Sequence, residues 1–597
     1  MGPGLNRANG MKNASYAAAL LCTAALAISS SSLAGTVPGW PSYLAMGAIG
    51  GPDVTPPTLT SRGSNDDFGG RPVDAVFKYA GANGNGDPGT IDPPTNATRM
   101  TGDLTILSGL NNHAMRVAIV EYTAQMSGGF SLADFSNSPD ADPASGGTYL
   151  MARHFISLAS DTIALNDQPV AYGGADYYGS QILNPDLLGV IEQGSFIANV
   201  NGALPAKAVD TAVDEALCFL TNTRSYFNTS NPNGLQSAPY LDKNYTGTPV
   251  SILEQLLADT YPVWSIDSAS DPYWNTAVNN LIGGTGTSYS QVGAWFNQCA
   301  AHPKYDHTLY KRPDFRSGFE GWVEANDWLI RTFSAQGKVT FGWQDNMWAA
   351  GSGFWLHADL TEPQIASAYS KPVSNWLKTN APSAIRSGAL GAYYAPDYFV
   401  FDRYESDDSA APDQATLYNA RAWDNYLMAV GLVSKSFGGI PVMLWQIPGS
   451  HIPYVGEAHP ELYNKTDGLY VFSTAPVYFF GDKKLAPDLG NIIAGPGTTT
   501  NGAVGNYAMN CGEYNCAGGS DYQQYLLAYK GQPDNFDWGR NNKKLAFAAG
   551  KAHVFAILWG GGNTTNVIKN FSNTDDHGWL AGKIIEYYKK PVMLPSN

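Results

Sequence analysis

Acidic residues crowd the end of one apolar run in a chain that is only 14% charged. The run "YFVFDRYESDD" extends from Tyr398 to Asp408 and contains Asp402 and Glu405. Neighbouring carboxylates repel each other, so one of them is expected to keep its proton towards neutral pH, as a general acid must. The alternative is an acid–arginine pair, in which Asp402 or Glu405 only fixes Arg403.

Three other apolar runs also end in a carboxylate: Asp186 in "LNPDLLG", Asp345 in "FGWQDNMW" and Glu121 in "IVEYTAQ". Asp186 could instead cap the helix that follows it, and Glu121 could form a buried pair with Lys78. Two facing carboxylates can cleave a glycosidic bond, because one protonates the leaving oxygen while the other attacks the sugar or activates water. A separation of about 5 Å would predict retention of configuration, and about 6.5 to 9.5 Å would predict inversion.

Aromatic and polar residues occur beside these acids, and their types suit sugar rings and hydroxyl groups. The predicted substrate-binding residues are Trp343, Trp445, Gln446, Arg403, Tyr122, Trp559 and His451. The chain has no Gly-x-Ser-x-Gly motif for a serine nucleophile and no His-Glu-x-x-His zinc motif. We therefore expect hydrolysis by carboxylates alone, without a metal or another cofactor.

Continuous apolar runs alternate with helical patterns along the chain, as in a parallel α/β fold whose strands are covered on both faces. Seven such runs begin near residues 74, 115, 180, 338, 397, 441 and 553. An eighth strand is predicted between Val250 and Ile266. Eight strands predict a (β/α)8 TIM-type barrel, which we prefer to an open doubly wound sheet. In such a barrel the carboxyl ends of the strands, and hence the acids, share one face.

The chain is expected to be exported and to fold as one domain. Arg7 and Lys12 precede an apolar stretch and a small-residue site, so residues 1–34 are predicted to be a signal peptide, with a retained anchor as the alternative. Residues 35–70 are predicted to form a Gly/Pro/Ser-rich leader, and 71–597 the catalytic domain. A Gly/Asn-rich insertion at about 454–532 is expected on the face that carries the acids.

The cysteines bear on the compartment of the protein, and the net charge bears on the partners that it can bind. Four cysteines follow the signal, and in an exported chain we predict the disulfides Cys511–Cys516 and, by elimination, Cys218–Cys299, with a zinc site as the weaker reading. The formal net charge of -16 disfavours nucleic acid and anionic membranes as partners.

The runs together resemble secreted glycoside hydrolases of the TIM-barrel type. The section from "MRVAIVEYTAQ" to "SQILNPDLLG" resembles family 6 cellulases, in which a strand ends in a Glu-Pro-Asp-Ser-Leu type motif with the Asp as general acid. Pro185, Asp186 and Leu188 stand at the matching positions, whereas Glu121 would have to replace that family's first Asp-rich strand end. The resemblance implies an extracellular hydrolase of a neutral polysaccharide, such as a β-glucan.

Two other functions remain open from the sequence. A non-catalytic carbohydrate-binding surface protein could use the same scaffold, because fold does not imply function. An amidase or a lipid-acting enzyme would need a nucleophile and a base that the sequence does not reveal.

Overall fold

The structure is a computed structural model that describes about half of the chain. The described residues are 36–50, 70–80, 95–122, 132–135, 150–217, 312–351, 353–357, 360–386, 390–403, 420–449, 451, 474–482, 543–560 and 578–595. The predicted signal peptide, the catalytic candidate Glu405, most of the predicted insertion and all four cysteines of the predicted disulfides lie outside them. No helix of the described residues has the length and apolar character needed to cross a membrane.

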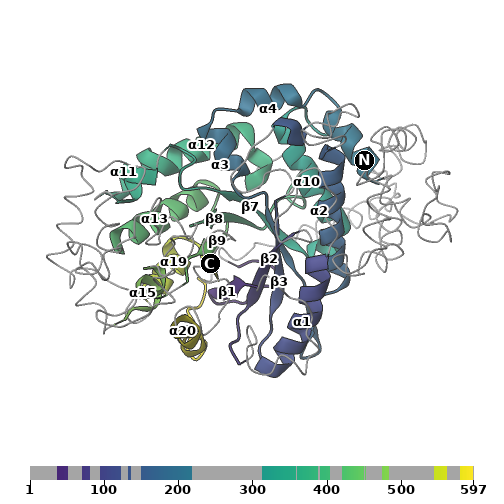
Figure 1. Ribbon diagram of the computed structural model, residues 1–597. Coiled ribbons are helices and arrows are strands. Elements are labelled where there is room, and N and C mark those ends of the chain that lie inside the picture. Colours follow the sequence, from purple (N-terminus) through teal and green to yellow (C-terminus); the bar gives the residue numbers. More distant parts are fainter. Residues whose placement is uncertain are drawn as a thin grey trace, which may run out of the picture.

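Eight parallel strands form a closed barrel at the centre of the molecule (Figure 1). The strands are β1 (Ala45–Ile49), β2 (Ala75–Tyr79), β3 (Arg116–Glu121), β6 (Ser180–Leu183), β7 (Thr340–Asp345), β8 (Tyr398–Asp402), β9 (Val442–Ile447) and β10 (Val554–Trp559). They follow one another around the barrel in chain order, and β10 pairs with β1 to close it. All residues of these strands are buried, including the glycine and the polar residues. Burial on both faces of the strands explains why their apolar runs are continuous.

The prediction of the eighth strand was wrong, because the barrel takes its remaining strand from the segment predicted to be a leader. β1 lies between β2 and β10, so the barrel closes without residues 250–266, which are outside the described part. Gly47 shows how tightly this strand is enclosed, since a Cβ there would lie 2.2 Å from the Leu558 side chain and 2.9 Å from the carbonyl oxygen of Ala75. A five-residue segment that includes Gly47 therefore forms a barrel strand.

Helices surround the barrel, as the helical patterns in the sequence predict (Figure 1). They are α1 (Thr95–Asn111), α2 (Leu150–Asp167), α3 (Leu187–Gln193), α4 (Ile197–Ala203), α10 (Phe319–Phe333), α11 (Glu362–Ile365), α12 (Lys371–Asn380), α13 (Ala420–Ser436), α15 (Ala475–Phe480), α19 (Lys543–Lys551) and α20 (Trp579–Tyr587). Smaller elements are 3₁₀ turns at Leu132–Phe135, Ala335–Gly337, Gly353–His357 and Pro382–Ile385, a π-helical turn at Ala366–Ser370, and a hairpin of β4 (Val170–Tyr172) and β5 (Ala175–Tyr177).

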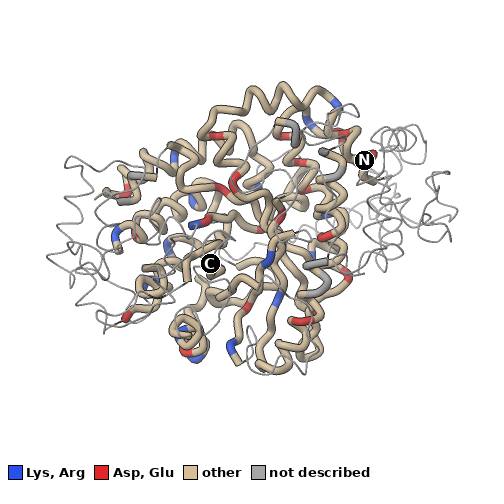
Figure 2. Tube along the Cα trace, in the orientation of Figure 1, with Lys and Arg blue, Asp and Glu red and all other residues tan. Residues whose placement is uncertain are grey.

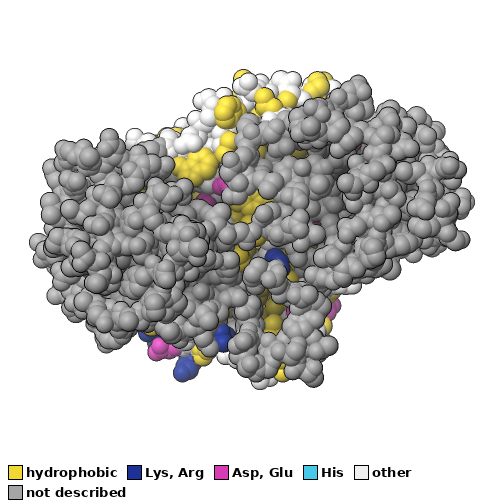
Figure 3. All heavy atoms as spheres, viewed as in Figure 1, with side chains coloured by type: hydrophobic (Ala, Val, Ile, Leu, Met, Phe, Trp, Pro, Cys, Tyr) yellow, Lys and Arg dark blue, Asp and Glu magenta, His cyan; other side chains and the backbone are white. Residues whose placement is uncertain are grey.

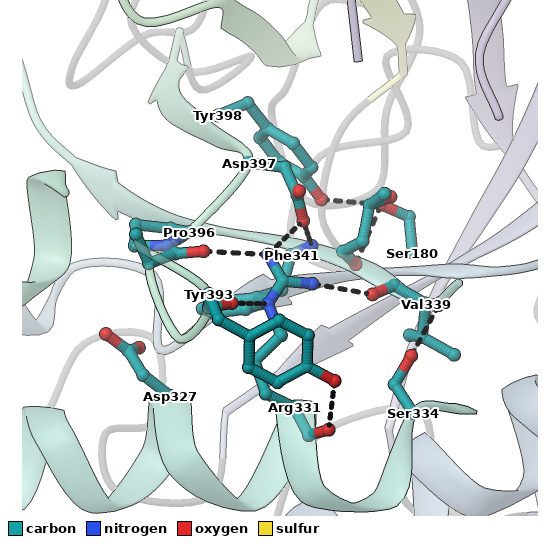
Figure 4. Close-up of polar contacts among 12 residues, drawn as sticks. Ser180, Asp327, Arg331, Ser334, Val339, Phe341, Tyr393, Pro396, Asp397 and Tyr398 are labelled. Atoms are coloured by element: carbon teal, nitrogen blue, oxygen red, sulfur yellow. Dashed lines mark hydrogen bonds and ion pairs between the residues drawn. The ribbon is translucent and has the colours of Figure 1, made fainter. Parts of the chain in front are cut away.

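Arg331 of α10 fixes the amino-terminal ends of β7 and β8 (Figure 4). Its guanidinium donates to the carbonyl oxygens of Tyr393, Val339 and Ala395 at 2.9, 3.1 and 2.7 Å. It also lies 2.9 Å from Asp397 Oδ2, which accepts the backbone N–H of Phe341 on β7 at 3.0 Å. This end of the barrel is therefore a buried, hydrogen-bonded anchor for the two strands.

Candidate active site at the carboxyl ends of the strands

A layer of polar and aromatic side chains fills the barrel interior at the carboxyl ends of the strands. Gln446 of β9 donates through Nε2 to the Tyr79 hydroxyl of β2 at 2.5 Å, although β10 and β1 separate these strands around the barrel. The Trp445 ring lies 6.3 Å from the Tyr122 ring, which follows β3. Such contacts can form only across the interior, so these side chains point into it.

Asp186 points into this layer rather than capping α3. It occupies the N-cap position of that helix, but its side chain makes no capping hydrogen bond, and its φ of 69° is left-handed. Its Oδ1 accepts Asn346 Nδ2 at 2.8 Å, and its Oδ2 accepts the Tyr122 hydroxyl at 3.4 Å. The capping alternative therefore fails, because the carboxylate is used inside the barrel.

Asp402 reaches the same amide from β8. Its Oδ1 accepts Gln344 Nε2 at 2.8 Å and Asn346 Nδ2 at 3.4 Å, and the residue is 6% exposed. Gln344 also accepts the backbone N–H of Asp186 through Oε1 at 2.6 Å. The structure thus brings two of the predicted acids together and links them through two amides of the β7 end.

Asp345 lies on the other side of β7. Side chains alternate along a strand, so Gln344 and Asn346 face the interior while Asp345 faces the helices. Asp345 Oδ1 accepts the backbone N–H of Asn346 at 2.8 Å. Burial and the nearby Glu192 of α3 raise the pKa of Asp345, and burial raises the pKa of Glu192 to about 7. This second pair of acids supports the site from behind and does not join it.

Asn346 is held from several directions. The Tyr369 hydroxyl donates to its carbonyl oxygen at 2.6 Å, and burial raises the pKa of Tyr369, which keeps that proton in place. Gly189 of α3 packs so closely that a Cβ there would lie 2.3 Å from Asn346 Oδ1. The amide that links the two carboxylates therefore has little freedom to turn.

Backbone strain accompanies the site. Asn184, Asp186 and Gln446 all have positive φ, at 37°, 69° and 52°, which is unfavourable for residues with a side chain. All three lie at or just after the ends of β6 and β9. Strained residues of this kind cluster at functional sites, where the surrounding packing holds them.

Several predicted site residues lie away from this layer. Glu121 accepts Gln181 Nε2 at 2.9 Å, and Gln181 in turn contacts Thr162 of α2, so this carboxylate faces the helices. Trp343 also faces outward, because its indole N–H donates to Asp327 of α10 at 2.9 Å. These two positions belong to the contact between barrel and helices.

Three further predicted binding residues have contacts at other places in the structure. Trp559 packs against Phe480 of α15 with ring centroids 5.9 Å apart. His451 pairs with Asp482 at 3.1 Å. Arg403 is buried, and its backbone N–H donates to the Trp445 carbonyl at 3.2 Å. Of the three tryptophans predicted as stacking surfaces, Trp445 alone shares the interior layer.

Gln344 and Asn346 were missed by the sequence analysis. They flank Asp345 in "WQDN". An acid at the end of a strand suggests catalysis, whereas an amide by itself does not. The alternation of a strand was the available signal, since it excludes Asp345 from the face that Gln344 and Asn346 share.

Charged residues are spread over the described part of the structure and do not gather into a metal site. Figure 2 shows their acidic and basic residues dispersed over the helices and the strand ends. Figure 3 shows hydrophobic, acidic and basic side chains of the described residues on one face of the molecule. Within the described ranges, no group of three or more His, Cys, Asp or Glu residues could hold a metal ion.

Comparison with known proteins gives no relative for this chain: no protein-family model matches it, and neither a curated protein nor a solved structure matches it significantly.

Proposed function

We propose that this chain is a glycoside hydrolase that cleaves a neutral polysaccharide, a β-glucan in the first instance, with Asp186 and Asp402 as its catalytic carboxylates. The observation that carries the proposal is that Asn346 Nδ2 donates to both carboxylates, at 2.8 and 3.4 Å, at the carboxyl ends of barrel strands. Reacting groups of barrel enzymes project from these ends. Two carboxylates on one site are the groups that glycoside hydrolysis needs.

The resemblance to family 6 cellulases divides the roles between the two acids, because the Asp at the position of Asp186 is the general acid of that family. Asp402 accepts from the amides of Gln344 and Asn346, and such donors favour the ionised form that a nucleophile or base requires. Asp186 is half-buried and so more exposed than Asp402, which is 6% exposed, and it can exchange a proton with solvent more readily. We assign Asp186 as the acid that protonates the leaving oxygen.

Aromatic and amide groups around the pair support a sugar as substrate. Tyr79, Tyr122 and Trp445 lie within 5.6 to 6.3 Å of one another by ring centroids, so they form one aromatic group in the interior layer. Aromatic faces suit the C–H faces of sugar rings, and amides such as Gln446 bind hydroxyls. The resemblance to family 6 cellulases supports a β-glucan as substrate. The predicted signal peptide supports an extracellular location.

Release of reducing sugar from a panel of β-glucans, mannan, xylan, chitin and α-glucans tests the proposal. The wild-type protein is compared with Asp186→Asn and Asp402→Asn, which keep shape but remove proton transfer and nucleophilic attack. Asp176→Asn, at an exposed position of the β5 hairpin, is the matched control. We expect cleavage of one polymer and a loss of about 10²- to 10⁴-fold in both site variants, but not in the control.

Two results would count against this function. Full activity in both site variants would move catalysis to other residues. Binding of a polymer without release of sugar, in folded wild-type protein, would favour the carbohydrate-binding alternative.

A further inference from the structure

We infer that the amino-terminal end of the barrel binds a small oxyanion, such as phosphate, sulfate or a carboxylate, on the guanidinium of Arg116. Arg116 is the first residue of β3, so it lies at the end of the barrel opposite the candidate active site. The inference therefore adds a second site and does not rest on the proposed function. Its basis is a buried cation whose hydrogen-bond donors are unused.

Arg116 carries a positive charge into the protein without hydrogen bonds from its inner nitrogens. The residue is 3% exposed, and within the described part of the structure its Nε and Nη1 atoms are buried and have no hydrogen-bond partner. An arginine side chain stays charged in proteins and has five N–H donors. Buried polar groups are normally hydrogen-bonded, and a buried charge without partners is costly. This guanidinium therefore requires an acceptor.

Asp74 balances the charge of Arg116 but has no lone pair left for its N–H groups. Burial lowers the pKa of Arg116, and the Asp74 carboxylate opposes this shift, so the two charges lie near each other. A carboxylate has about four lone-pair positions, and four donors already use those of Asp74. These donors are the Tyr43 hydroxyl at 2.6 Å and His113 Nε2 at 3.0 Å on Oδ1, and the backbone N–H of Met46 at 2.9 Å and the Tyr588 hydroxyl at 2.9 Å on Oδ2. The arrangement favours an acceptor from outside the chain.

Two aromatic rings lie beside the guanidinium and determine how an anion can reach it. Arg116 Cζ lies 4.7 Å from the ring centroid of Trp40 and 5.9 Å from that of Tyr177. Trp40 is fixed, because its indole N–H donates to Thr340 Oγ1 at 3.3 Å and its ring packs edge-on against Phe555 at 5.0 Å. Tyr177 is half-buried and belongs to the separate two-stranded sheet of β4 and β5. Because such a hairpin is only marginally stable by itself, displacement of Tyr177 is the least costly route to Arg116.

The chemistry of the donor favours an oxyanion over a halide. A guanidinium presents its N–H groups in one plane, and pairs of them match the spacing of oxygens in a carboxylate or a phosphate. The formal net charge of -16 repels anions from the protein as a whole. Binding would therefore depend on the local arrangement at Arg116.

Thermal unfolding of the full chain tests the inference. The probes are sodium phosphate, sulfate and acetate, each compared with sodium chloride at equal ionic strength in a buffer whose other anion is chloride. Phosphate and sulfate stabilise many proteins by exclusion from the surface, so the informative quantity is the difference between variants. At 100 times the dissociation constant, the bound oxyanion should raise the midpoint of the wild type by about 2 °C more than that of Arg116→Met. The exposed Lys371→Met is the matched control and should respond as the wild type does.

Isothermal titration calorimetry of the wild type with the same salts is the second measurement, and it does not depend on whether Arg116→Met folds. We expect one saturable site per chain, for acetate if the site selects carboxylates and for phosphate or sulfate if it selects tetrahedral oxyanions. Arg116→Lys keeps the charge but loses the planar fork, and it should bind about tenfold more weakly or worse. Equal midpoint shifts in the wild type and Arg116→Met would show a general salt effect and overturn the site. Chloride binding as tight as that of the oxyanions, or no saturable heat with any of the salts, would also overturn the inference.

Discussion

Asn346 is the residue that connects the candidate catalytic groups. Its side chain donates to Asp186 and Asp402, and its backbone is bound by Asp345 on the N–H side and by Tyr369 on the carbonyl side. Hydrogen bonds to charged groups contribute about 1.5 to 3 kcal/mol each. Loss of this amide should therefore disturb both acids at once without touching the rest of the barrel.

Asn346→Ala should lower kcat about 10- to 100-fold, because each carboxylate loses a charge-assisted hydrogen bond. KM should change little, since the amide holds the acids rather than the sugar. Steady-state kinetics on the cleaved polymer measure both constants. Asn380→Ala, at the half-buried end of α12, is the matched control and should leave kcat unchanged. An unchanged kcat in Asn346→Ala would contradict the bridging role.

The sequence identified some of these residues and missed others for physical reasons. Asp186 and Asp402 were predictable, because a carboxylate after a buried apolar run stands out and barrel strands end at one face. Asp345 was placed wrongly in the site, because the sequence does not reveal which face of β7 points inward. The placement of Gln344 and Asn346 in the site depends on the same question, namely which face of β7 points inward. Glu405 stays a prediction, since it lies outside the described residues.

Helix α3 positions the site through its closest contact with the end of β7. Gly189 presents its Cα to Asn346 and leaves no space for a side chain. Glu192, one turn further along α3, contributes to the raised pKa of Asp345. The same short helix therefore limits the position of the bridging amide and holds an acid behind it.

Gly189→Ala should reduce kcat about tenfold or more, although Gly189 carries no chemical group, because a Cβ would lie 2.3 Å from Asn346 Oδ1 and displace the amide. Gly202→Ala on α4 is the matched control, since nothing lies within 4 Å of its added Cβ. That variant should be neutral or stabilising by up to about 1 kcal/mol. Kinetics and thermal unfolding of both variants check this, and equal kcat values would show that α3 does not constrain the site.

Glu192 should make stability depend on pH. Burial raises its pKa from 4.5 to about 7, so the folded state favours the protonated acid. Its contribution is fully present below about pH 4.5 and is lost as pH rises through about 7, so the free energy of unfolding should fall over that interval. Glu192→Gln should flatten this part of the profile, measured by urea unfolding between pH 4.5 and 8. The exposed Glu362→Gln should not, and identical profiles for both variants would contradict the burial argument.

Most elements could be predicted from the sequence because their apolar runs are long and continuous. The eighth strand could not, because β1 has five residues, includes Gly47 and lies in a segment rich in glycine and proline. Its neighbours supply the stability that its own residues lack, through β2 on one side and β10 on the other. Only the closure of the barrel identifies it as a strand.

If the proposed function holds, the groups for stability and those for chemistry lie at opposite ends of the barrel. The amino-terminal end contains the buried network around Arg331, and the carboxyl-terminal end contains the linked carboxylates. Barrel enzymes carry their active sites at the carboxyl ends of the strands, so this placement of the acids agrees with the proposed function. Changes at the two ends should therefore have different consequences.

Arg331→Met should lower the free energy of unfolding by about 3 to 5 kcal/mol, because it leaves Asp397 buried without its cationic partner. The activity of the protein that remains folded at low temperature should stay close to that of the wild type. Chemical denaturation and low-temperature kinetics test both parts, with the exposed Lys371→Met as control. A stable protein with reduced kcat would contradict the separation of the two ends.

We propose that Asp186 and Asp402 form the catalytic pair of a glycoside hydrolase. The most direct measurement is the rate of reducing-sugar release from a soluble β-glucan by the wild-type protein, Asp402→Asn and Asp176→Asn under identical conditions. We expect release by the wild type and by Asp176→Asn, and a loss of about 10²-fold or more in Asp402→Asn with its fold intact. Equal rates in all three proteins would contradict the role of Asp402, and release by none of them would contradict the proposed action on β-glucan.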